Sequence, residues 1–347
     1  MEYGHGGDKY NYEDVVDFSI NINPLGMSEH VKEAAKRGIE DSIYYPDRYC
    51  RKLREQLGEK LALPNDMIVV ANGAAELIYS MVLADKPKKA LIPIPTFSEY
   101  ERALKMVNCE IEYYQTKENN YFIIDKSFLN ELNEELDIVF LCSPSNPSGR
   151  VIDKKLIRQI IERCQYLNIR CVLDECFIEF YEEGTVSLEQ MKENSKLFVL
   201  RAFTKTYGMP GLRLGYALTS DKNLLYCIHR SCQPWNVSIP AQYAGLAALE
   251  EPERVLEMRE LVCKERKKIE QKLKDLGIKF ISSEVNFILL HSEINLFERL
   301  LDFHILIRDC SNYRGLEHGW YRIAIRSEEE NERLLYAIEQ ILSGGGK

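Results

Sequence analysis

The sequence predicts an α/β protein in which helices cover a mostly parallel sheet, with a smaller α+β domain attached. Two observations support this fold class. From about residue 67 to 220, short apolar runs rich in β-branched residues alternate with amphipathic stretches of helical length. After Pro240 the pattern changes to one long charged stretch, followed by short strand-like runs and a last helix. Strand, helix and strand at this spacing form right-handed crossovers between parallel strands.

The alternating region contains the elements of the larger domain. Its predicted strands are 67–71, 89–95, 137–142, 169–175 and 196–201, and its predicted helices are 74–84, 97–107 and 153–167. Ligands bind to sheets of this kind at the carboxyl ends of the strands. The residues that follow each predicted strand are therefore the first candidates for a site.

The second region contains the elements of the smaller domain. We expect a long helix closed by Gly277, three short strands and a final helix, over 252–276, 285–290, 305–308, 320–326 and 328–342. The predicted division places the large domain at 43–245. Residues 1–42 and 246–347 then form an N-terminal arm and the small domain.

Composition excludes several classes of function. The chain has 347 residues and a formal net charge of −9, which repels nucleic acid and anionic membranes. No apolar run approaches the ~18 residues that a membrane span needs. The 10 cysteines include no C-x-x-C pair, so we expect reduced thiols in a cytoplasmic protein with no metal site. An anionic ligand would need a local cluster of basic residues.

Four polar residues follow predicted strands in order along the chain: Asn146, Asp174, Lys205 and Arg213. Each alone is most often a turn residue, a helix cap or a solvated cation. Together they supply the amide, carboxylate, amine and guanidinium that pyridoxal 5'-phosphate requires. The lysine would form the Schiff base, the carboxylate would keep the pyridine nitrogen protonated, and the arginine would neutralise the phosphate. The combination predicts a pyridoxal-phosphate site.

Longer motifs carry a family resemblance over nearly the whole chain. Around SPSNPSG143–149, VLDE172–175 and GLRLGY211–216, the sequence resembles fold-type I pyridoxal-phosphate enzymes of the histidinol-phosphate aminotransferase branch. The resemblance implies the aspartate-aminotransferase-like fold. Within the branch, HGGD5–8 and RIAIRS322–327 are most similar to the L-threonine O-3-phosphate decarboxylases of cobalamin synthesis.

The resemblance assigns cofactor contacts to residues at matching positions. Lys205 would hold the cofactor covalently, Asp174 would face the pyridine nitrogen, and Asn146 would bond the ring oxygen. The other implied contacts are Gly73, Ala74, Ala75, Thr204 and Arg213 at the phosphate, Phe97 and Phe177 at the ring, and Tyr45 from a neighbouring subunit. Ala75 and Ala202 depart from the family, because relatives commonly have Ser or Thr there. A homodimer with a shared active site is part of this hypothesis.

The resemblance also implies how a small phosphorylated amino acid would bind. Arg322 matches the family's carboxylate-binding arginine, and Arg326 is expected on the same face of the same strand. His5, Asn23 and Arg308 are expected to contact the substrate's phosphate. Two anions on one substrate require two separate cationic anchors.

The implied reaction is decarboxylation of L-threonine O-3-phosphate to (R)-1-amino-2-propanol O-phosphate for cobalamin (vitamin B12) biosynthesis. One alternative is an aminotransferase acting on histidinol phosphate or a similar amino acid. Another is a decarboxylase of a related substrate such as serine phosphate. The third alternative is a non-catalytic pyridoxal-binding regulator. It is disfavoured because such regulators usually carry an added DNA-binding domain, and we expect no room for one in 347 residues.

Overall fold

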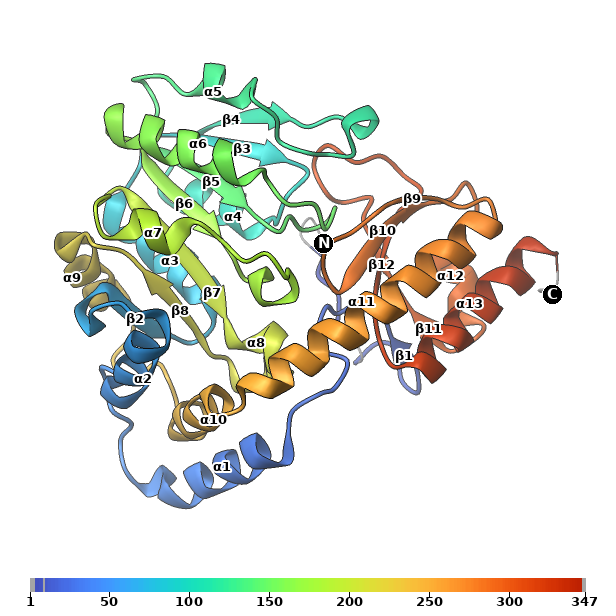
Figure 1. Cartoon of the computed structure of the whole chain (residues 1–347), viewed down its shortest axis with the longest axis horizontal. Coiled ribbons are helices and arrows are strands. Elements are labelled where there is room, and N and C mark those ends of the chain that lie inside the picture. The colour runs from blue at the N-terminus through green and yellow to red at the C-terminus, as the bar shows by residue number, and fades with distance from the viewer. Residues whose placement is uncertain (1–3, 9, 345–347) are drawn as a thin grey trace.

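A seven-stranded sheet organises the larger part of the molecule (Figure 1). The computed structural model describes residues 4–8 and 10–344. The strand order is β2-β8-β7-β6-β5-β3-β4, and β8 runs antiparallel to both of its neighbours while the other pairs are parallel. The strands are β2 (Ile68–Ala71), β3 (Lys89–Ile94), β4 (Glu110–Gln115), β5 (Ile138–Cys142), β6 (Arg170–Asp174), β7 (Leu197–Ala202) and β8 (Gly215–Leu218). The predicted α/β fold class with a mostly parallel sheet is confirmed.

Helices cover both faces of this sheet. One face packs against α3 (Ala74–Asp85), α4 (Glu99–Met106) and α9 (Lys222–Ser231). The opposite face packs against α2 (Arg51–Leu61), α5 (Phe128–Glu131), α6 (Lys154–Tyr166), α7 (Ser187–Met191), α8 (Phe203–Thr206) and α10 (Ile239–Leu249). Single turns of 3₁₀ helix occur at Asp41–Ile43, Asn65–Met67, Glu118–Asn120, Ile178–Phe180 and Pro210–Leu212.

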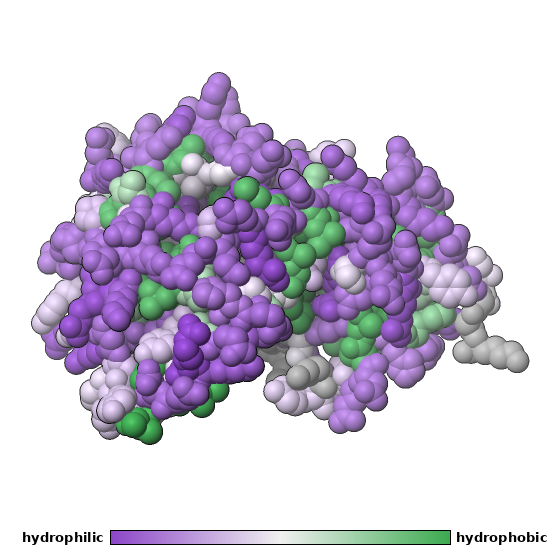
Figure 2. Space-filling model, turned by 60° about the horizontal axis from the view of Figure 1, so that its bottom comes forward, coloured by the Kyte–Doolittle hydropathy of each residue, from purple (hydrophilic) through white to green (hydrophobic). Residues whose placement is uncertain are grey.

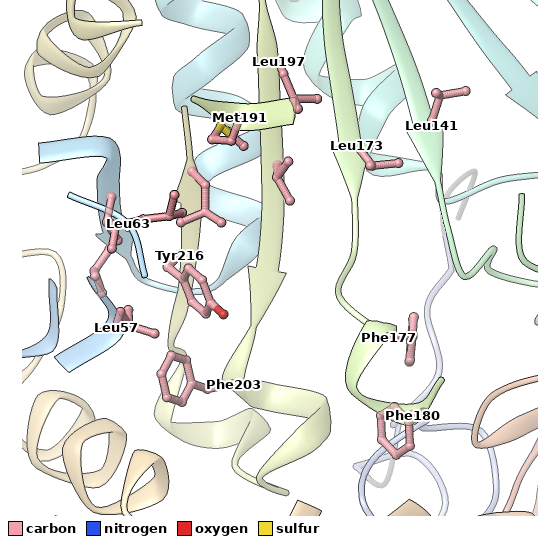
Figure 3. Close-up of a cluster of buried hydrophobic side chains, with 14 of the residues drawn as sticks. Leu57, Leu63, Leu141, Leu173, Phe177, Phe180, Met191, Leu197, Phe203 and Tyr216 are labelled. Atoms are coloured by element: carbon pink, nitrogen blue, oxygen red, sulfur yellow. The ribbon is translucent and has the colours of Figure 1, made fainter. Parts of the chain in front are cut away.

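The strands of the sheet are apolar on both faces because both faces are covered. In β5, Val139 and Leu141 point into one core cluster, while Ile138, Phe140 and Cys142 point into the other. Figure 3 shows Leu141, Leu173 and Leu197 on the neighbouring strands β5, β6 and β7, all members of the first cluster. This rigid layer fixes the positions of the residues at the strand ends.

A second, four-stranded antiparallel sheet of order β12-β13-β10-β9 forms the smaller domain, beside a two-stranded parallel sheet of β1 and β11. The elements are β1 (Val16–Asp17), β9 (Lys279–Ile281), β10 (Phe287–His291), β11 (Ile305–Leu306), β12 (Arg308–Asp309), β13 (Trp320–Ala324), α12 (Leu296–Leu301) and α13 (Glu328–Leu342). The predicted strand 305–308 is divided between β11 and β12 at buried Ile307. The predicted strand 320–326 ends at Ala324, so Arg326 lies beyond it.

Helix α11 (Pro252–Asp275) joins the two domains and spans the space between them in Figure 1. Val255 and Met258 in its first half pack into the large core, whereas Ile269 and Leu273 pack into the small one. The N-terminal segment also contacts both domains, because α1 (Glu29–Glu40) packs against α10 while β1 pairs with β11. The predicted domain boundaries stay a prediction.

Polar side chains fix where several helices begin. The Asp153 carboxylate accepts hydrogen bonds from the backbone of Lys155 and Leu156 at the start of α6. Ser327 and Glu330 form a reciprocal capping box at the start of α13. Within the described ranges, no helix combines the length and the apolar character that crossing a membrane demands.

Candidate active site

A cavity of about 450 Å³ is lined by residues of both domains and of the N-terminal arm. It lies at the carboxyl ends of β5, β6 and β7, where the sheet topology predicts a ligand site. Twelve of the residues predicted from the sequence line it: His5, Ala74, Ala75, Phe97, Asn146, Asp174, Phe177, Thr204, Lys205, Arg213, Arg308 and Arg322. Strand ends far apart in the sequence therefore converge on one cavity.

Asp174 is the last residue of β6 and is held by two hydrogen bonds. Its Oδ1 accepts from the Cys176 backbone N–H at 2.9 Å, and its Oδ2 accepts from the Tyr100 hydroxyl at 2.5 Å. Tyr100 is fully buried and stacks on Phe140 with ring centroids 4.8 Å apart. Tyr100 was not among the predicted site residues, although it lies three residues after Phe97 in the same predicted helix. These two hydrogen bonds hold the Asp174 carboxylate in place in the cavity wall.

Lys205 lies on α8, directly after β7. Its Nζ is 6.0 Å from the centroid of the Phe177 ring, and no hydrogen-bond or ion-pair partner for this amine is found within the described chain. Burial, together with the charges of Arg322 and Arg213, lowers the pKa of Lys205 to about 8. An amine with this pKa is available in its neutral, nucleophilic form near physiological pH.

The start of α3 forms an anion-binding corner. Gly73 occupies the N-cap position with φ +85, and no side chain caps the first turn. A Cβ at Gly73 would stand 2.5 Å from Arg213 Nη2, and one at Gly215 would stand 2.4 Å from the Ala74 nitrogen. The two glycines therefore allow a guanidinium and a strand to approach the helix start closely. Free N–H groups at a helix N-terminus beside an arginine suit a phosphate.

Arg322 on β13 connects the small domain to the strand ends of the large one. It is 6% exposed, and its Nη1 donates to Asn146 Oδ1 and, at 3.3 Å, to the Tyr313 hydroxyl. Its Nη2 donates to the Ser19 carbonyl at 3.0 Å. Its Nε is buried and has no partner among the described residues. An unpaired buried donor on an arginine that lines a cavity fits a carboxylate ligand.

A second cationic group lies where the N-terminal arm meets β12. Arg308 donates to the Asn312 side chain at 2.7 Å and to the Gly4 carbonyl. His5 places its Nε2 at 2.8 Å from Oε1 of Glu99, a carboxylate that the sequence analysis did not single out. The His5 ring centroid is 5.9 Å from that of Phe97. The arm thereby forms part of the cavity wall.

Four predicted residues lie outside the cavity lining: Gly73 at the start of α3, Asn23, Arg326 and Tyr45. Asn23 is buried in a turn, where it donates to the Thr206 carbonyl at 2.7 Å and accepts from the Leu25 N–H. Arg326 donates to the Asp17 carbonyl at 3.0 Å and pairs with Glu330 at 2.8 Å. Asn23 and Arg326 thus lie away from the cavity, and its lining gives no support to the expectation that they touch the substrate; the buried Nε of Arg326 has no partner among the described residues. Tyr45 is 78% exposed, and its predicted role in a neighbouring subunit stays a prediction.

Comparison with known proteins identifies the family. Residues 13–338 match the family "Aminotransferase class I and II". The chain belongs to this family. Among curated relatives, it is 38% identical over 336 residues to the threonine-phosphate decarboxylase of Salmonella typhimurium, which covers 96% of this chain and 92% of that protein.

Two solved structures of this aminotransferase fold are similar over most of their length. The histidinol-phosphate aminotransferase of Clostridium acetobutylicum superposes with a TM-score of 0.88 at 30% identity, covering 94% of this chain and 99% of that one. The L-threonine-O-3-phosphate decarboxylase of Porphyromonas gingivalis superposes with a TM-score of 0.85 at 26% identity and the same coverage, 94% and 99%. The predicted resemblance is confirmed.

Enzymes of the class I and II aminotransferase family depend on pyridoxal phosphate, and this chain is a pyridoxal-phosphate-dependent enzyme. The residues present fit that cofactor. The uncapped start of α3 beside Arg213 suits its phosphate, and the unpaired Lys205 amine suits covalent attachment. Ala75 and Ala202 line the cavity with methyl groups and offer no hydroxyl donors. Among the residues described, no group of His, Cys, Asp and Glu side chains could hold a metal ion.

Proposed function

We propose that the chain decarboxylates L-threonine O-3-phosphate to (R)-1-amino-2-propanol O-phosphate, the aminopropanol unit of cobalamin. The observation that carries the proposal is a single cavity lined by arginines from two separate strands. Arg322 has an unpaired Nε, while Arg308 lies on β12 and lines the cavity together with His5. A phosphorylated amino acid carries one anion for each of these two arginines. The 38% identity to a threonine-phosphate decarboxylase supports the same assignment.

The site geometry supports the cofactor contacts that we propose from the family resemblance. Lys205 would hold pyridoxal phosphate through its amine, with Asp174 at the ring nitrogen and Asn146 at the ring oxygen. When bound, the cofactor withdraws electrons from the substrate's α carbon. Phe97 and Phe177 would enclose the ring. The cofactor's phosphate would meet the backbone N–H groups of Ala74 and Ala75 behind Gly73, with Thr204 and Arg213.

Arg322 determines the proposed reaction by orienting the substrate. Its unpaired Nε and its anchored Nη groups would hold the carboxylate in one direction, so that the bond to the carboxylate is the one aligned for cleavage. If the C–H bond were aligned instead, transamination would follow. After carbon dioxide leaves, the Lys205 amine would return a proton to the α carbon.

Family members are typically dimeric, and we propose that this chain forms a homodimer with a shared active site. Ile43, Tyr44 and Tyr45 are consecutive apolar residues with exposed fractions of 81%, 67% and 78%. The Tyr45 ring packs against Trp235, another exposed aromatic residue, at 4.6 Å. Figure 2 shows one face of the molecule, which is mostly hydrophilic with scattered hydrophobic patches. A partner subunit would cover Ile43, Tyr44 and Trp235 and receive Tyr45.

We also propose a cytoplasmic location, because all ten cysteines are free of disulfide bonds. A histidinol-phosphate-type aminotransferase is the second candidate function, favoured by the structural likeness at a TM-score of 0.88. Serine phosphate is the closest competing substrate. It lacks one methyl group, which is worth only ~1–3 kcal/mol of discrimination.

Product analysis by mass spectrometry tests the proposal. Purified enzyme loaded with cofactor is incubated with threonine phosphate, serine phosphate, threonine or histidinol phosphate, each with and without 2-oxoglutarate. We expect aminopropanol phosphate from threonine phosphate without any acceptor. A 2-oxo product that forms only with 2-oxoglutarate would establish the aminotransferase instead, and ethanolamine phosphate as the dominant product would assign serine phosphate.

A further inference from the structure

Glu99 is a buried carboxylate in the cavity wall to which the proposed reaction gives no role. It is the first residue of α4, and its side chain is 9% exposed. It accepts hydrogen bonds from His5 Nε2 at 2.8 Å, from the Tyr79 hydroxyl at 2.5 Å and from Arg102 at 3.1 Å. A buried negative charge beside a site for anionic substrates destabilises the folded protein unless nearby donors and cations compensate the charge.

The partners of Glu99 keep it ionised. Burial alone would raise the pKa of this carboxyl, but the hydrogen bonds from His5 and Tyr79 and the nearby charge of Arg102 outweigh burial and lower the pKa to about 2. The group is therefore a carboxylate throughout the physiological range. It faces the one imidazole that lines the described part of the cavity.

The N-terminal arm delivers that imidazole in a fixed position. The Gly7 N–H donates to Ser19 Oγ at 2.7 Å, and the Gly4 carbonyl accepts from the Asn312 side chain at 3.2 Å. A Cβ on Gly6 would stand 2.3 Å from the Ser19 carbonyl oxygen, so this position has room only for glycine. The close approach of Gly6 and Gly7 to Ser19 lets the arm hold His5 against α4.

The pairing also determines which ring nitrogen of His5 remains available. Nε2 faces the Glu99 carboxylate and carries a proton there, which leaves Nδ1 without a partner among the described residues. His5 and Arg308 line both the main cavity and an adjoining one of about 260 Å³. The other charged residues of the adjoining cavity, Glu101 and Arg314, are paired with each other at 3.0 Å. Arg308 is thus the cation that shares this space with His5.

We propose that Glu99 is a positioning residue for the phosphate end of the cavity: it holds the His5 ring through Nε2, so that the opposite edge of the ring meets the substrate's phosphate together with Arg308. The inference rests on the proposed function, because it concerns the selectivity of that site for a phosphorylated substrate. Glu99 itself would touch neither the substrate nor the cofactor. Arg102 balances the negative charge of Glu99 locally.

The decisive variant is Glu99→Gln, which keeps the size and an acceptor oxygen but removes the charge. The cofactor is first fixed with borohydride, so that its own phosphate site is filled and turnover is blocked. Inorganic phosphate is then titrated calorimetrically. We expect the Kd for phosphate to rise about tenfold, the scale of one charge-assisted hydrogen bond. With unreduced enzyme, KM for threonine phosphate should rise similarly while kcat stays within about twofold.

His5→Ala and the double variant separate positioning from a general structural effect. In the His5→Ala background, Glu99→Gln should change the Kd for phosphate by less than about twofold, because the group it acts through is absent. If the two substitutions changed the Kd for phosphate additively, the proposal would be overturned. Glu99→Asp keeps the charge on a shorter side chain, and its Kd for phosphate should lie between those of the parent and of Glu99→Gln. If Glu99→Gln does not fold, Glu99→Asp replaces it in the same cycle, and an unchanged Kd there would equally contradict the proposal.

The His30–Glu250 pair provides a matched control, since it joins the same two groups at 3.0 Å outside the cavity. Glu250→Gln should leave the Kd for phosphate unchanged, and an equal loss in that variant would overturn the assignment to Glu99. The titration tests Glu99 independently of turnover. If product analysis assigned another phosphorylated substrate, the proposed function would be wrong. The role of Glu99 would still be decided by the Kd for phosphate alone.

Discussion

Replacing Arg322 with Ala tests whether orientation of the substrate's carboxylate determines the reaction. The guanidinium is 6% exposed and bridges Asn146 and the Ser19 carbonyl, with Nε left unpaired. The substitution removes both the proposed carboxylate anchor and one of the contacts between the two domains. Turnover and stability should therefore both change, and they must be measured separately.

The expected loss in turnover follows from what Arg322 does. Loss of orientation together with a charge-assisted pair predicts a fall in kcat of at least ~100-fold. The Ser19 carbonyl would lose its donor, which costs the folded state about 1–3 kcal/mol for a buried group left unsatisfied, whereas Asn146 Oδ1 would keep the hydrogen bond from the Tyr313 hydroxyl. A variant that still folds and binds cofactor should thus be less stable as well as nearly inactive.

Carbon dioxide release from threonine phosphate is the assay, and thermal unfolding of the same preparations gives the stability. Arg326→Ala is the matched control, because Arg326 also bonds a backbone carbonyl of the N-terminal segment but lies outside the cavity. That variant should lose stability and keep kcat within about twofold. Near-normal carbon dioxide release by Arg322→Ala, or an equal loss by Arg326→Ala, would refute the reasoning.

Four further predictions concern the cofactor and the dimer. Borohydride reduction should fix a pyridoxyl group on Lys205, seen by peptide mapping, and an adduct on another lysine would remove the site assignment. Because burial lowers the pKa of Lys205 to about 8, uptake of cofactor by apo-protein should speed up as pH rises through about 8 and the amine loses its proton; a midpoint near 10.5 would contradict the lowered pKa. Tyr100→Phe removes only the hydroxyl that holds Asp174 and should raise the Kd for pyridoxal phosphate about tenfold by absorbance titration; an unchanged Kd would show that Tyr100 only packs. Mixing Lys205→Ala with Tyr45→Ala protein should restore up to about a quarter of parental activity, since mixed dimers contain one intact shared site; no recovery after subunit exchange would argue against sharing.

The strand-end chemistry could be predicted from sequence because topology constrains it strongly. Asn146, Asp174 and Lys205 each follow a buried apolar run, and parallel strands bring such positions to one edge. Strands at the sheet edge and very short strands were harder to predict. Neither β4 nor the antiparallel β8 was predicted, because β4 is a half-buried edge strand and β8 is only four residues long.

The contacts that complete the site could not be predicted because they join distant parts of the chain. Arg322 reaches Asn146 across 176 residues and His5 reaches Glu99 across 94, and no local pattern encodes either pairing. The error at Arg326 came from extending a strand two residues too far, since a period-two pattern applies only while the strand continues. Asn23 begins the sequence Asn-Pro-Leu-Gly, which is typical of turns, and its side chain is used by that turn.

The most direct test of the proposed reaction follows the labelled carboxylate of threonine phosphate in heavy water. The cofactor-loaded enzyme is given substrate carrying carbon-13 in the carboxyl group, without 2-oxoglutarate, and gas and product are analysed by mass spectrometry. We expect labelled carbon dioxide and aminopropanol phosphate carrying one deuterium on the carbon that lost the carboxylate. Retention of the label in a 2-oxo acid, or no label in the gas, would contradict decarboxylation.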